Sequence, residues 1–355
     1  MRKYVALLLV LLMVLPLVAC TGKTPADKPA GTKADSSKEI VIGVLFDFLS
    51  VESRVRQKSE LERYAKEKGV KLVFQSANGD EKLQLQQAEN LISQKVDAIC
   101  ILAQNADACK PIAKQCKEAG IPFIVTDRLI EGTDIDYYVG FDNESIGYMQ
   151  VNYVFERMPK GNWVMISGAP TDPNCKIWHD AWIKVTKPAV EKGDIKIIVD
   201  EKCDNWDPAI ALKHMENALT SANDKIDVAL VMNDGLGTGV NQALEARGLS
   251  GKVMMTGLDG ETVAFQRIAE GKQSMTILID DIKTAQAIID TCISAVKGEQ
   301  VKTNGTINNG FEDVPAVMVD LIPIDKDNLM DAIKMGYGDY DNIYKNVPED
   351  KRPKK

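Results

Sequence analysis

From Ile40 onward, the sequence alternates short apolar runs with longer amphipathic segments, almost without interruption. This alternation is typical of a parallel sheet that carries helices on both faces. The run at residues 121–125 shows it well, because it follows the helix-ending Gly120, is apolar throughout, and is soon followed by Asp127 and Arg128. Such a run is expected to be a strand that is buried on both faces of the sheet.

The strand and helix pattern is duplicated along the chain. Residues 68–73 are echoed by residues 192–198, and residues 88–92 by residues 215–219, in the same order and at nearly the same spacing. Strand-like segments at 135–140, 274–279 and 314–319 are placed where the chain could cross between two such halves. The sequence therefore predicts an α/β protein with two similar, doubly wound parallel-sheet lobes joined by a three-strand hinge.

The expected boundaries follow from these crossings. We expect residues 39–140 and 280–314 to form the N-terminal lobe, residues 141–279 and 315–345 to form the C-terminal lobe, and residues 346–355 to form a tail. Such lobes can close about the hinge on a ligand.

The N-terminus predicts export. Arg2 and Lys3 precede an uncharged apolar run that ends in Leu-Val-Ala-Cys at residues 17–20, which indicates a lipoprotein signal peptide over residues 1–19. Its Leu-Val-Ala-Cys sequence resembles a bacterial lipobox, so Cys20 is the expected site of lipidation. Residues 20–38 are expected to form a disordered tether. No later segment is long and apolar enough to cross a bilayer.

Composition argues against several classes of function. The net charge of −8 and the pI of about 5.1 disfavour a nucleic-acid-binding protein. His179 and His214 belong to no recognisable nucleophile or metal motif, and the remaining cysteines match no Cys-x-x-Cys pattern. We therefore expect no catalytic residue, metal or cofactor, and buried reduced thiols, although export leaves a disulfide possible. The glycine-rich segment at 235–239 imitates a dinucleotide loop, but a flexible helix start explains it better.

Polar and aromatic side chains gather where the predicted strands end. Because ligands bind outside the carboxyl ends of parallel strands, these positions are candidate ligand contacts; they include Phe46, Phe48, Asp127, Arg128, Asp172, Asn174, Trp206, Asn233 and Asp259. Acids, amides and one arginine suit the paired hydroxyls of a neutral sugar. Trp206, Phe46 and Phe48 are the candidate aromatic plates for the apolar face of its ring.

Local roles explain some of these residues equally well. Asp172 and Asp207 each precede a proline at an expected helix start, where an aspartate commonly caps the helix. Asn233 and Asp234 could also form a simple cap, and Trp206 could be a hydrophobic staple. Asp127 and Arg128 could form an ordinary solvated ion pair. For Asp207 we favour the cap.

Several segments together resemble a known family. They are residues 75–79, 127–128, 134–137, 141–144, 215–220, 248–253 and 308–310. At this spacing they are similar to the periplasmic sugar-binding proteins of ABC importers (type I), and within them to the D-xylose-binding proteins, over essentially the whole mature chain. The resemblance implies ligand contacts from Asp127, Arg128, Asp172, Asn174, Trp206, Asn233 and Asp259.

Three positions depart from the pattern of the D-xylose-binding proteins. Those proteins typically have an Arg followed by a Trp where this chain has Ser53 and Arg54, and a Lys where it has Ile279. Arg54 could replace the missing arginine, so it joins the candidate site. The identity of the sugar, D-xylose or a related aldose, therefore depends on positions where the chain differs from the family.

The expected function is that of an extracytoplasmic solute-binding protein, lipid-anchored on the outer face of the cytoplasmic membrane. It would bind a monosaccharide and deliver it, as a monomer, to the permease of an ABC transporter. The alternative is a co-receptor that reports the sugar to a membrane sensor kinase or chemoreceptor, because closure would generate that signal equally well. Two further alternatives are weaker. The carboxylates have no feature that distinguishes a glycosidase, and a sugar-responsive repressor would begin with a helix-turn-helix segment.

Overall fold

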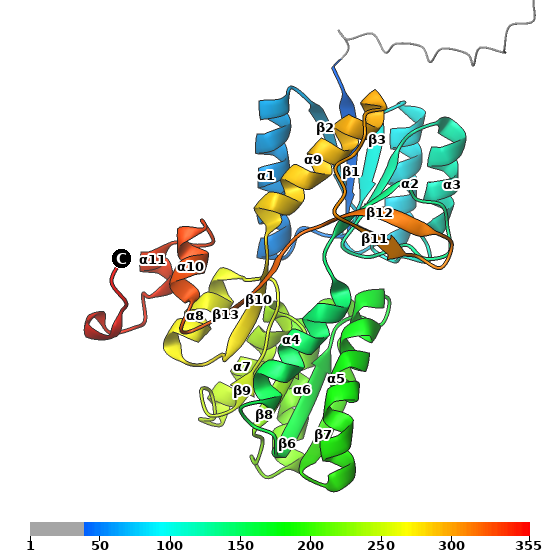
Figure 1. Ribbon diagram of the computed structural model, residues 1–355. Coiled ribbons are helices and arrows are strands. Elements are labelled where there is room, and N and C mark those ends of the chain that lie inside the picture. The colour runs from blue at the N-terminus through cyan, green and yellow to red at the C-terminus, as the bar shows by residue number, and fades with distance from the viewer. Residues whose placement is uncertain (1–38) are drawn as a thin grey trace, which may run out of the picture. The chain divides into compact units, whose positions relative to one another are not determined.

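The computed structural model describes residues 39–355. The signal peptide, the lipidation site at Cys20 and the tether up to residue 38 lie outside the described residues and stay predictions. Within the described part, the chain forms two α/β lobes, which Figure 1 shows one above the other.

The first lobe is built on a seven-stranded sheet with the order β11-β12-β5-β4-β3-β1-β2. The strands from β1 to β5 and β12 pair in parallel, and β11 pairs antiparallel with β12 at the edge. Their bounds are β1 Val41–Phe46, β2 Lys71–Ser76, β3 Ala98–Ile101, β4 Phe123–Thr126, β5 Tyr137–Gly140, β11 Gly305–Asn308 and β12 Asp313–Met318.

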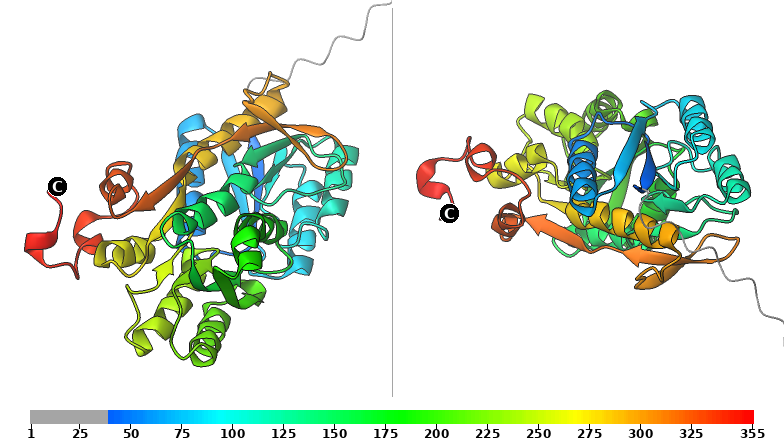
Figure 2. Two further views of the ribbon diagram at one scale, coloured as in Figure 1. Left: turned by 60° about the horizontal axis from the view of Figure 1, so that its bottom comes forward. Right: turned by 90° about the horizontal axis from the view of Figure 1, so that it is seen from above.

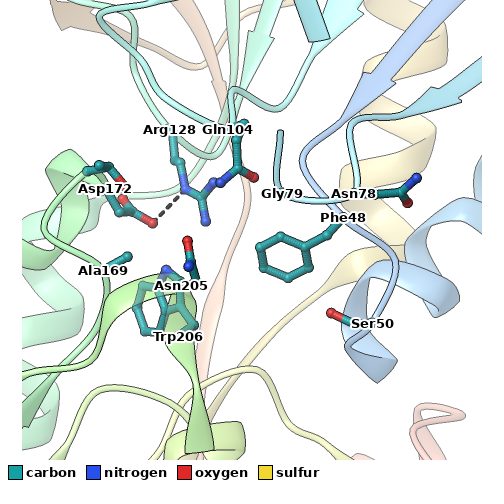
Figure 3. Close-up of a pocket in the computed structure, with 11 residues that line it drawn as sticks. Phe48, Ser50, Asn78, Gly79, Gln104, Arg128, Ala169, Asp172, Asn205 and Trp206 are labelled. Atoms are coloured by element: carbon teal, nitrogen blue, oxygen red, sulfur yellow. Dashed lines mark hydrogen bonds and ion pairs between the residues drawn. The ribbon is translucent and has the colours of Figure 1, made fainter. Parts of the chain in front are cut away.

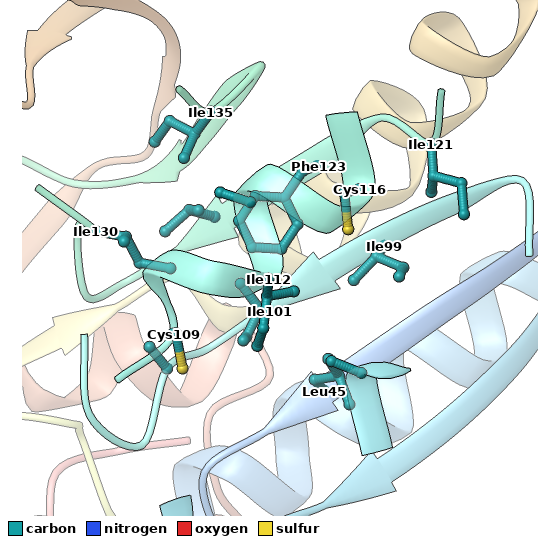
Figure 4. Packing of buried hydrophobic residues seen from close by; sticks show 14 of the residues in the cluster. Leu45, Ile99, Ile101, Cys109, Ile112, Cys116, Ile121, Phe123, Ile130 and Ile135 are labelled. Atoms are coloured by element: carbon teal, nitrogen blue, oxygen red, sulfur yellow. The ribbon is translucent and has the colours of Figure 1, made fainter. Parts of the chain in front are cut away.

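Helices cover both faces of this sheet, as its parallel strands require. Side chains of β1 alternate between two cores: Leu45 packs with α2 and α3, whereas Ile42, Val44 and Phe46 pack with α1 and α9. Figure 4 shows the first of these cores, with Leu45, Ile112 and Phe123 among its members. The helices are α1 Glu52–Lys68, α2 Glu81–Ser93, α3 Lys110–Ala119 and α9 Asp281–Lys297.

The second lobe repeats the arrangement around a four-stranded parallel sheet with the order β7-β6-β8-β9. A parallel bridge between Leu258 and Ile277 continues this sheet to β10, which pairs antiparallel with β13. The bounds are β6 Gly161–Ser167, β7 Ile195–Lys202, β8 Val228–Val231, β9 Met254–Met255, β10 Met275–Ile279 and β13 Leu321–Asp325.

Two cores flank the second sheet as well. Trp163 and Trp182, both fully buried, fill the core under α4 and α5, and the core on the other face contains residues of α6 and α7. The glycine-rich segment at 235–239 lies inside α7, where a Cβ on Gly239 would come within 2.0 Å of the Pro208 carbonyl of α6. Gly239 therefore serves the close packing of α7 on α6. The helices are α4 Asn143–Phe155, α5 Pro173–Lys192, α6 Pro208–Ser221, α7 Asp234–Ala246 and α8 Thr262–Glu270.

The C-terminal residues pack on α8 of the second lobe. Phe265 and Ile268 of α8 share a core with Leu329, Tyr337 and Ile343. This region contains α10 Leu329–Lys334, α11 Tyr340–Ile343 and the 3-10 helix η2 Glu349–Lys351. Figure 2 shows it extending beside the second lobe, away from the edge strands β11 and β12.

Three connections join the lobes: β5 to α4, β10 to α9, and β12 to β13. The α/β architecture with two parallel-sheet lobes is therefore confirmed. The boundaries within it stay a prediction, and the limit expected between 314 and 315 falls inside β12, which pairs with β5 of the first sheet through Met318.

Three further observations concern the described residues. The six cysteines after Cys20 are all free and buried. In residues 39–355, no helix combines the length and the apolar character that a membrane span requires. The same residues contain no group of three or more His, Cys, Asp or Glu side chains that could hold a metal ion.

Candidate functional site

Arg128 lies at the centre of a polar cluster that joins the two lobes. It follows β4 of the first lobe, and its Nε donates to Asp172 Oδ2 of the second lobe at 2.5 Å. Its Nη1 donates to the Ala103 carbonyl at 2.8 Å and lies 3.0 Å from Asp47 Oδ2. All three charged side chains are buried, so these ion pairs are formed largely away from water.

Asp127 forms the second cross-lobe contact. Its Oδ1 accepts from Asn174 Nδ2 of α5 at 3.0 Å, and its Oδ2 pairs with Arg54 Nη2 of α1 at 2.5 Å. Asp127 has a φ of 62°, in the left-handed region, and its carbonyl accepts from the Tyr138 hydroxyl at 2.8 Å. Backbone strain of this kind persists where the surroundings fix it, and it is concentrated at functional sites.

Asn233 and Asp259 extend the cluster within the second lobe. Asn233 Nδ2 donates to Asp259 Oδ2 at 3.2 Å, while Asn233 Oδ1 accepts from the Leu236 amide and so caps α7. Asp259 has a φ of 100° and follows the short strand β9. Both residues line the inner part of the cleft between the lobes.

Within residues 39–355, four aromatic residues line the cleft, and of these Trp206 and Phe48 extend along most of it. Trp206 comes from the 3-10 helix η1 Asp204–Trp206, and Phe48 from the loop after β1. The indole of Trp206 approaches the backbone so closely that a Cβ on Gly168 would lie 2.3 Å from its ring, and it meets Trp178 edge-on at 6.2 Å. Glycine at 168 is therefore required for this position of the indole.

Phe46 was expected to be a plate, and the structure corrects this. Its side chain is fully buried in the core between β1, α1 and α9, where it meets Phe74 edge-on at 4.9 Å. It lines neither chamber of the cleft. As the last residue of β1, Phe46 points into the core, whereas Phe48, beyond the strand end, faces the cleft.

The cleft contains two connected chambers. The inner chamber has a volume of about 40 Å³ and is lined by Ser53, Arg54, Asp127, Asn233 and Asp259 together with the apolar side chains of Phe141, Trp178, Leu258 and Ile279. The outer chamber has a volume of about 310 Å³ and is lined by Ser50, Asn78, Gln104, Thr171 and Asn205 among others. Phe48, Arg128, Asp172 and Trp206 line both.

Figure 3 shows the outer chamber from close by. Phe48 and Trp206 lie on different sides of the space, and Arg128 and Gln104 lie above it. The outer chamber is at the lower limit of the range of about 300 to 1,000 Å³ that is usual for small-molecule sites. The arrangement provides two aromatic faces with hydrogen-bonding groups between them.

Burial dominates the electrostatics of this cluster. It raises the pKa of the carboxyl groups of Asp47 and Asp172, against the opposing effect of Arg128. The pKa of Asp259 is likewise raised by burial, against Arg54. The pKa of Arg128 is above its usual value, because the surrounding aspartates outweigh the lowering effect of burial. Both arginines therefore remain charged.

Most of the candidate residues line the cleft. Arg54, Asp127, Arg128, Asp172, Trp206, Asn233 and Asp259 all line the cleft, whereas Asn174 lines neither chamber and contacts Asp127. Asp172 and Asn233 combine both suggested roles, since each caps a helix and also reaches the cluster. Asp207 is exposed and caps α6 through the Ala209 amide at 2.8 Å, as favoured.

Other lining residues were not predicted. Gln104 follows β3, and Asn78 follows β2, so the strand-end argument could have included both. Asn205 follows β7 beside the predicted Trp206, so the same argument could have included it, whereas Trp178 gave no such signal, because it reaches the cleft from within α5.

The chemistry of the cluster is that of binding. His179 and His214 lie elsewhere, where they contact Asp200 and the Lys202 carbonyl. Carboxylates, guanidinium groups and amides provide strong hydrogen bonds to hydroxyl groups. Trp178 and Trp206 line the cleft, and the Nε1 atom of each is buried without a hydrogen-bond partner among residues 39–355. A small polyhydroxylated molecule would match these groups.

Comparison with known proteins agrees with this geometry. Residues 42–300 match the model of a periplasmic binding protein domain. The D-xylose-binding periplasmic protein of Escherichia coli is 37% identical over 300 residues, which cover 84% of this chain and 91% of that protein. The D-xylose-binding periplasmic protein of Haemophilus influenzae is 36% identical, with coverages of 87% and 93%.

A solved structure shows the same fold. An ABC transporter solute-binding protein from Clostridium phytofermentans with bound β-D-glucose superposes with a TM-score of 0.79 at 27% identity. The match covers 85% of this chain and 99% of that one.

Proposed function

The chain belongs to the periplasmic binding protein family, a family of binding proteins rather than enzymes, and from this premise we propose that it binds one neutral monosaccharide between its lobes. D-xylose or a related aldose is the proposed ligand. The observation that carries the proposal is the cross-lobe cluster of Asp127, Arg128 and Asp172, bordered by Phe48 and Trp206.

The hydrogen bonds within this cluster indicate how a sugar would be held. Asp127, Arg128 and Asp172 would exchange part of their contacts with one another for contacts with neighbouring hydroxyls, which are donors and acceptors at once. Asn233 and Asp259 would bind hydroxyls from the second lobe. Phe48 and Trp206 would cover the apolar faces of the ring.

A neutral ligand fits the charges of the site. Asp47, Asp127, Asp172 and Asp259 surround Arg54 and Arg128, so an anionic sugar would face an excess of carboxylates. Bringing a further negative charge beside buried carboxylates is costly, because like charges repel strongly where the dielectric is low. Neutral sugars avoid this cost.

We further propose that the protein is an exported lipoprotein, attached through Cys20 to the outer face of the cytoplasmic membrane, and that it delivers the sugar to an ABC transporter permease. The lipobox-like residues 17–20 support the anchor. Several relatives carry names of import or periplasmic binding proteins, including the ribose import binding protein RbsB of Bacillus subtilis, which is 28% identical. These names support the proposed delivery.

Calorimetry tests the ligand. The purified protein is titrated with D-xylose, D-ribose, L-arabinose, D-glucose and D-galactose, and heat is expected with at least one aldose. Asp259→Ala should weaken the best interaction by about 2 kcal/mol, because it removes a buried charged hydrogen-bond partner. Asp180→Ala is the matched control, since Asp180 is exposed on α5. Absence of heat with every sugar, or turnover of any of them, would contradict the proposal.

A genetic experiment tests delivery. Deletion of the gene should abolish uptake of the radiolabelled sugar. If uptake persisted while sugar-induced transcription was lost, the protein would be a sensor rather than a transport protein.

A further inference from the structure

The first turn of α1 in the first lobe contacts the beginning of α8 in the second. Glu52 Oε2 accepts from the Thr262 backbone amide at 2.9 Å, and Glu52 Oε1 accepts from the Thr262 hydroxyl at 2.6 Å. The residue at the N-cap of α8, Glu261, makes no side-chain capping hydrogen bond. The carboxylate that caps α8 therefore comes from the other lobe.

Arg56, one turn further along α1, makes a second contact across the lobes. Its Nη2 donates to the backbone carbonyl of Asp259 at 3.0 Å, and its Nε donates to Asp281 Oδ2 of α9 at 2.8 Å. Its guanidinium lies 5.2 Å from the centre of the Tyr337 ring. Arg56 thus holds the backbone of Asp259, whose side chain lines the inner chamber and whose φ is 100°.

We propose that Glu52 and Arg56, here named the α1 latch, hold the closed form of the protein and position Asp259, and so set how fast the bound sugar leaves. This proposal rests on the proposed function, because it assumes that a sugar binds beside Asp259. Neither latch residue lines either chamber, so both are positioning residues.

The physical reason is that both contacts join two lobes that separate when the cleft opens. On opening, the Thr262 amide loses its acceptor in Glu52 and the Asp259 carbonyl loses its donor in Arg56, and water must replace them. A negative charge at the N-terminus of α8 also gains from the helix dipole, and this gain exists only while the lobes are closed. Contacts that differ between two states shift the equilibrium between those states.

Glu52 can be changed without disturbing a core, whereas Arg56 also pairs with the buried Asp281, so the stability of Arg56→Met is measured alongside its kinetics. The side chains of Glu52 and Arg56 have exposed fractions of 43% and 19%, and the two residues also form an i,i+4 pair at 3.5 Å on the surface of α1. Glu62 provides a matched control, because it lies on the same helix, is exposed, and pairs with Lys58 inside the first lobe.

Stopped-flow measurement of tryptophan fluorescence tests the latch, with the best sugar from calorimetry as the ligand. Glu52→Ala should raise the dissociation rate about tenfold, because it removes two hydrogen bonds to a charged group that is 43% exposed, where water replaces part of the loss. The association rate should change less than twofold. Arg56→Met should raise the dissociation rate more than Glu52→Ala, because Asp259 also loses its support. Glu52→Gln keeps an acceptor oxygen and should therefore raise the dissociation rate less than Glu52→Ala does. Glu62→Ala should leave both rates unchanged.

Hydrogen exchange gives an independent measurement on the unmodified protein. Sugar should slow exchange of the Thr262 amide, and in Glu52→Ala this slowing should disappear. Unchanged dissociation rates in both latch variants, or an effect on the association rate alone, would contradict the proposed role of the α1 latch. Neither result would contradict sugar binding itself. If the unmodified protein bound no sugar, the proposed function itself would fail.

Discussion

Replacing Arg128 by methionine is the most informative perturbation of the site. The substitution keeps the unbranched apolar stem of the side chain and removes the charged guanidinium group. Asp47 and Asp172, with exposed fractions of 0% and 4%, then lose the cation that lies between them. The Ala103 carbonyl loses a donor as well.

The magnitude follows from the burial of these groups. Removing one partner of a buried ion pair costs about 3–5 kcal/mol, because an uncompensated charge is left in a medium of low dielectric. The free energy of unfolding should therefore fall by this amount in Arg128→Met. Exposed pairs contribute at most about 1 kcal/mol, so Arg63→Met, which affects the exposed pairs with Glu60 and Glu67 on α1, should cost far less.

The loss of stability in Arg128→Met should depend on pH. Burial already raises the pKa of Asp47 and Asp172, and Arg128 opposes this effect. Without Arg128 both values rise further, and the two carboxyl groups can become neutral at low pH. A pKa that is raised in the folded state lowers stability as the pH rises through it. Arg128→Met should therefore lose more stability at pH 8 than at pH 5.5.

Urea denaturation followed by tryptophan fluorescence at both pH values measures this difference. The double variant Arg128→Met/Asp172→Asn should regain part of the stability at pH 8, because one buried carboxylate is removed. If Arg128→Met were as stable as Arg63→Met at both pH values, Arg128, Asp47 and Asp172 would not form a buried ion network. Retention of full sugar affinity in Arg128→Met would separately remove Arg128 from the binding site.

Three further perturbations have distinct readouts. Phe48→Ala should lower sugar affinity about tenfold with little loss of stability, whereas Phe46→Ala should cost about 3–5 kcal/mol of stability. Calorimetry measures the affinity and urea denaturation measures the stability. If Phe46 covered the sugar ring, Phe46→Ala would lower the affinity and Phe48→Ala would not. Gly168→Ala should displace Trp206, because its Cβ would lie 2.3 Å from the ring, and an unchanged affinity and emission spectrum would exclude this. Burial raises the pKa of Glu261 to about 8, aided by neighbouring carboxylates. The protein should therefore lose stability as the pH rises from about 5 to 8, by about 1.4 kcal/mol for each pH unit that separates the pKa of Glu261 in the folded protein from its pKa in the unfolded chain. Glu261→Gln should flatten the dependence of the melting temperature on pH in this range, and parallel profiles for both proteins would contradict the assignment.

The sequence predicted several cleft residues from their positions after strands, because the carboxyl ends of parallel strands lie at the same edge of a sheet. Residues that follow β4, β8 and β9 meet at the same edge of their sheets, so Asp127, Arg128, Asn233 and Asp259 gathered as expected. The argument does not depend on knowing any side-chain contact. It needs only the order of strands and helices, which the apolar runs and the glycines after the helices already indicate.

The choice between Phe46 and Phe48 could not be made in the same way. Side chains on a strand alternate between its two faces, and beyond the strand end this rule no longer applies. A sequence locates a strand end only to within a few residues. Phe46 proved to be the last residue of β1 and Phe48 the second residue beyond it, so the two aromatic rings have opposite environments.

The third connection between the lobes shows a related limit. Residues 313–318 form β12, the second strand from the edge of the sheet, which pairs with β11 and β5, and only some of its residues are buried. A partly buried strand fits either sheet equally well, so its pattern alone does not assign it to a lobe. Contacts such as Glu52 to Thr262 were beyond prediction for another reason, since they join residues 210 positions apart without any local signal.

The three positions that depart from the pattern of the D-xylose-binding proteins lie in the same part of the structure. Ile279 in β10 is far along the chain from Ser53 and Arg54 in α1, yet all three line the inner chamber. Arg54 there pairs with Asp127, and Ile279 lies with Phe141 and Leu258 on the apolar side. The resemblance implies an Arg, a Trp and a Lys at these positions, so the exchange removes two cations and one aromatic side chain and adds one cation. Arg128 and Asp172, which the resemblance also implies, line both chambers, whereas Ser53, Arg54 and Ile279 line only the inner one. Selectivity should therefore differ from that of the D-xylose-binding proteins for the groups of the sugar that lie beside Ser53, Arg54 and Ile279, and agree with it for the hydroxyls that face Arg128 and Asp172.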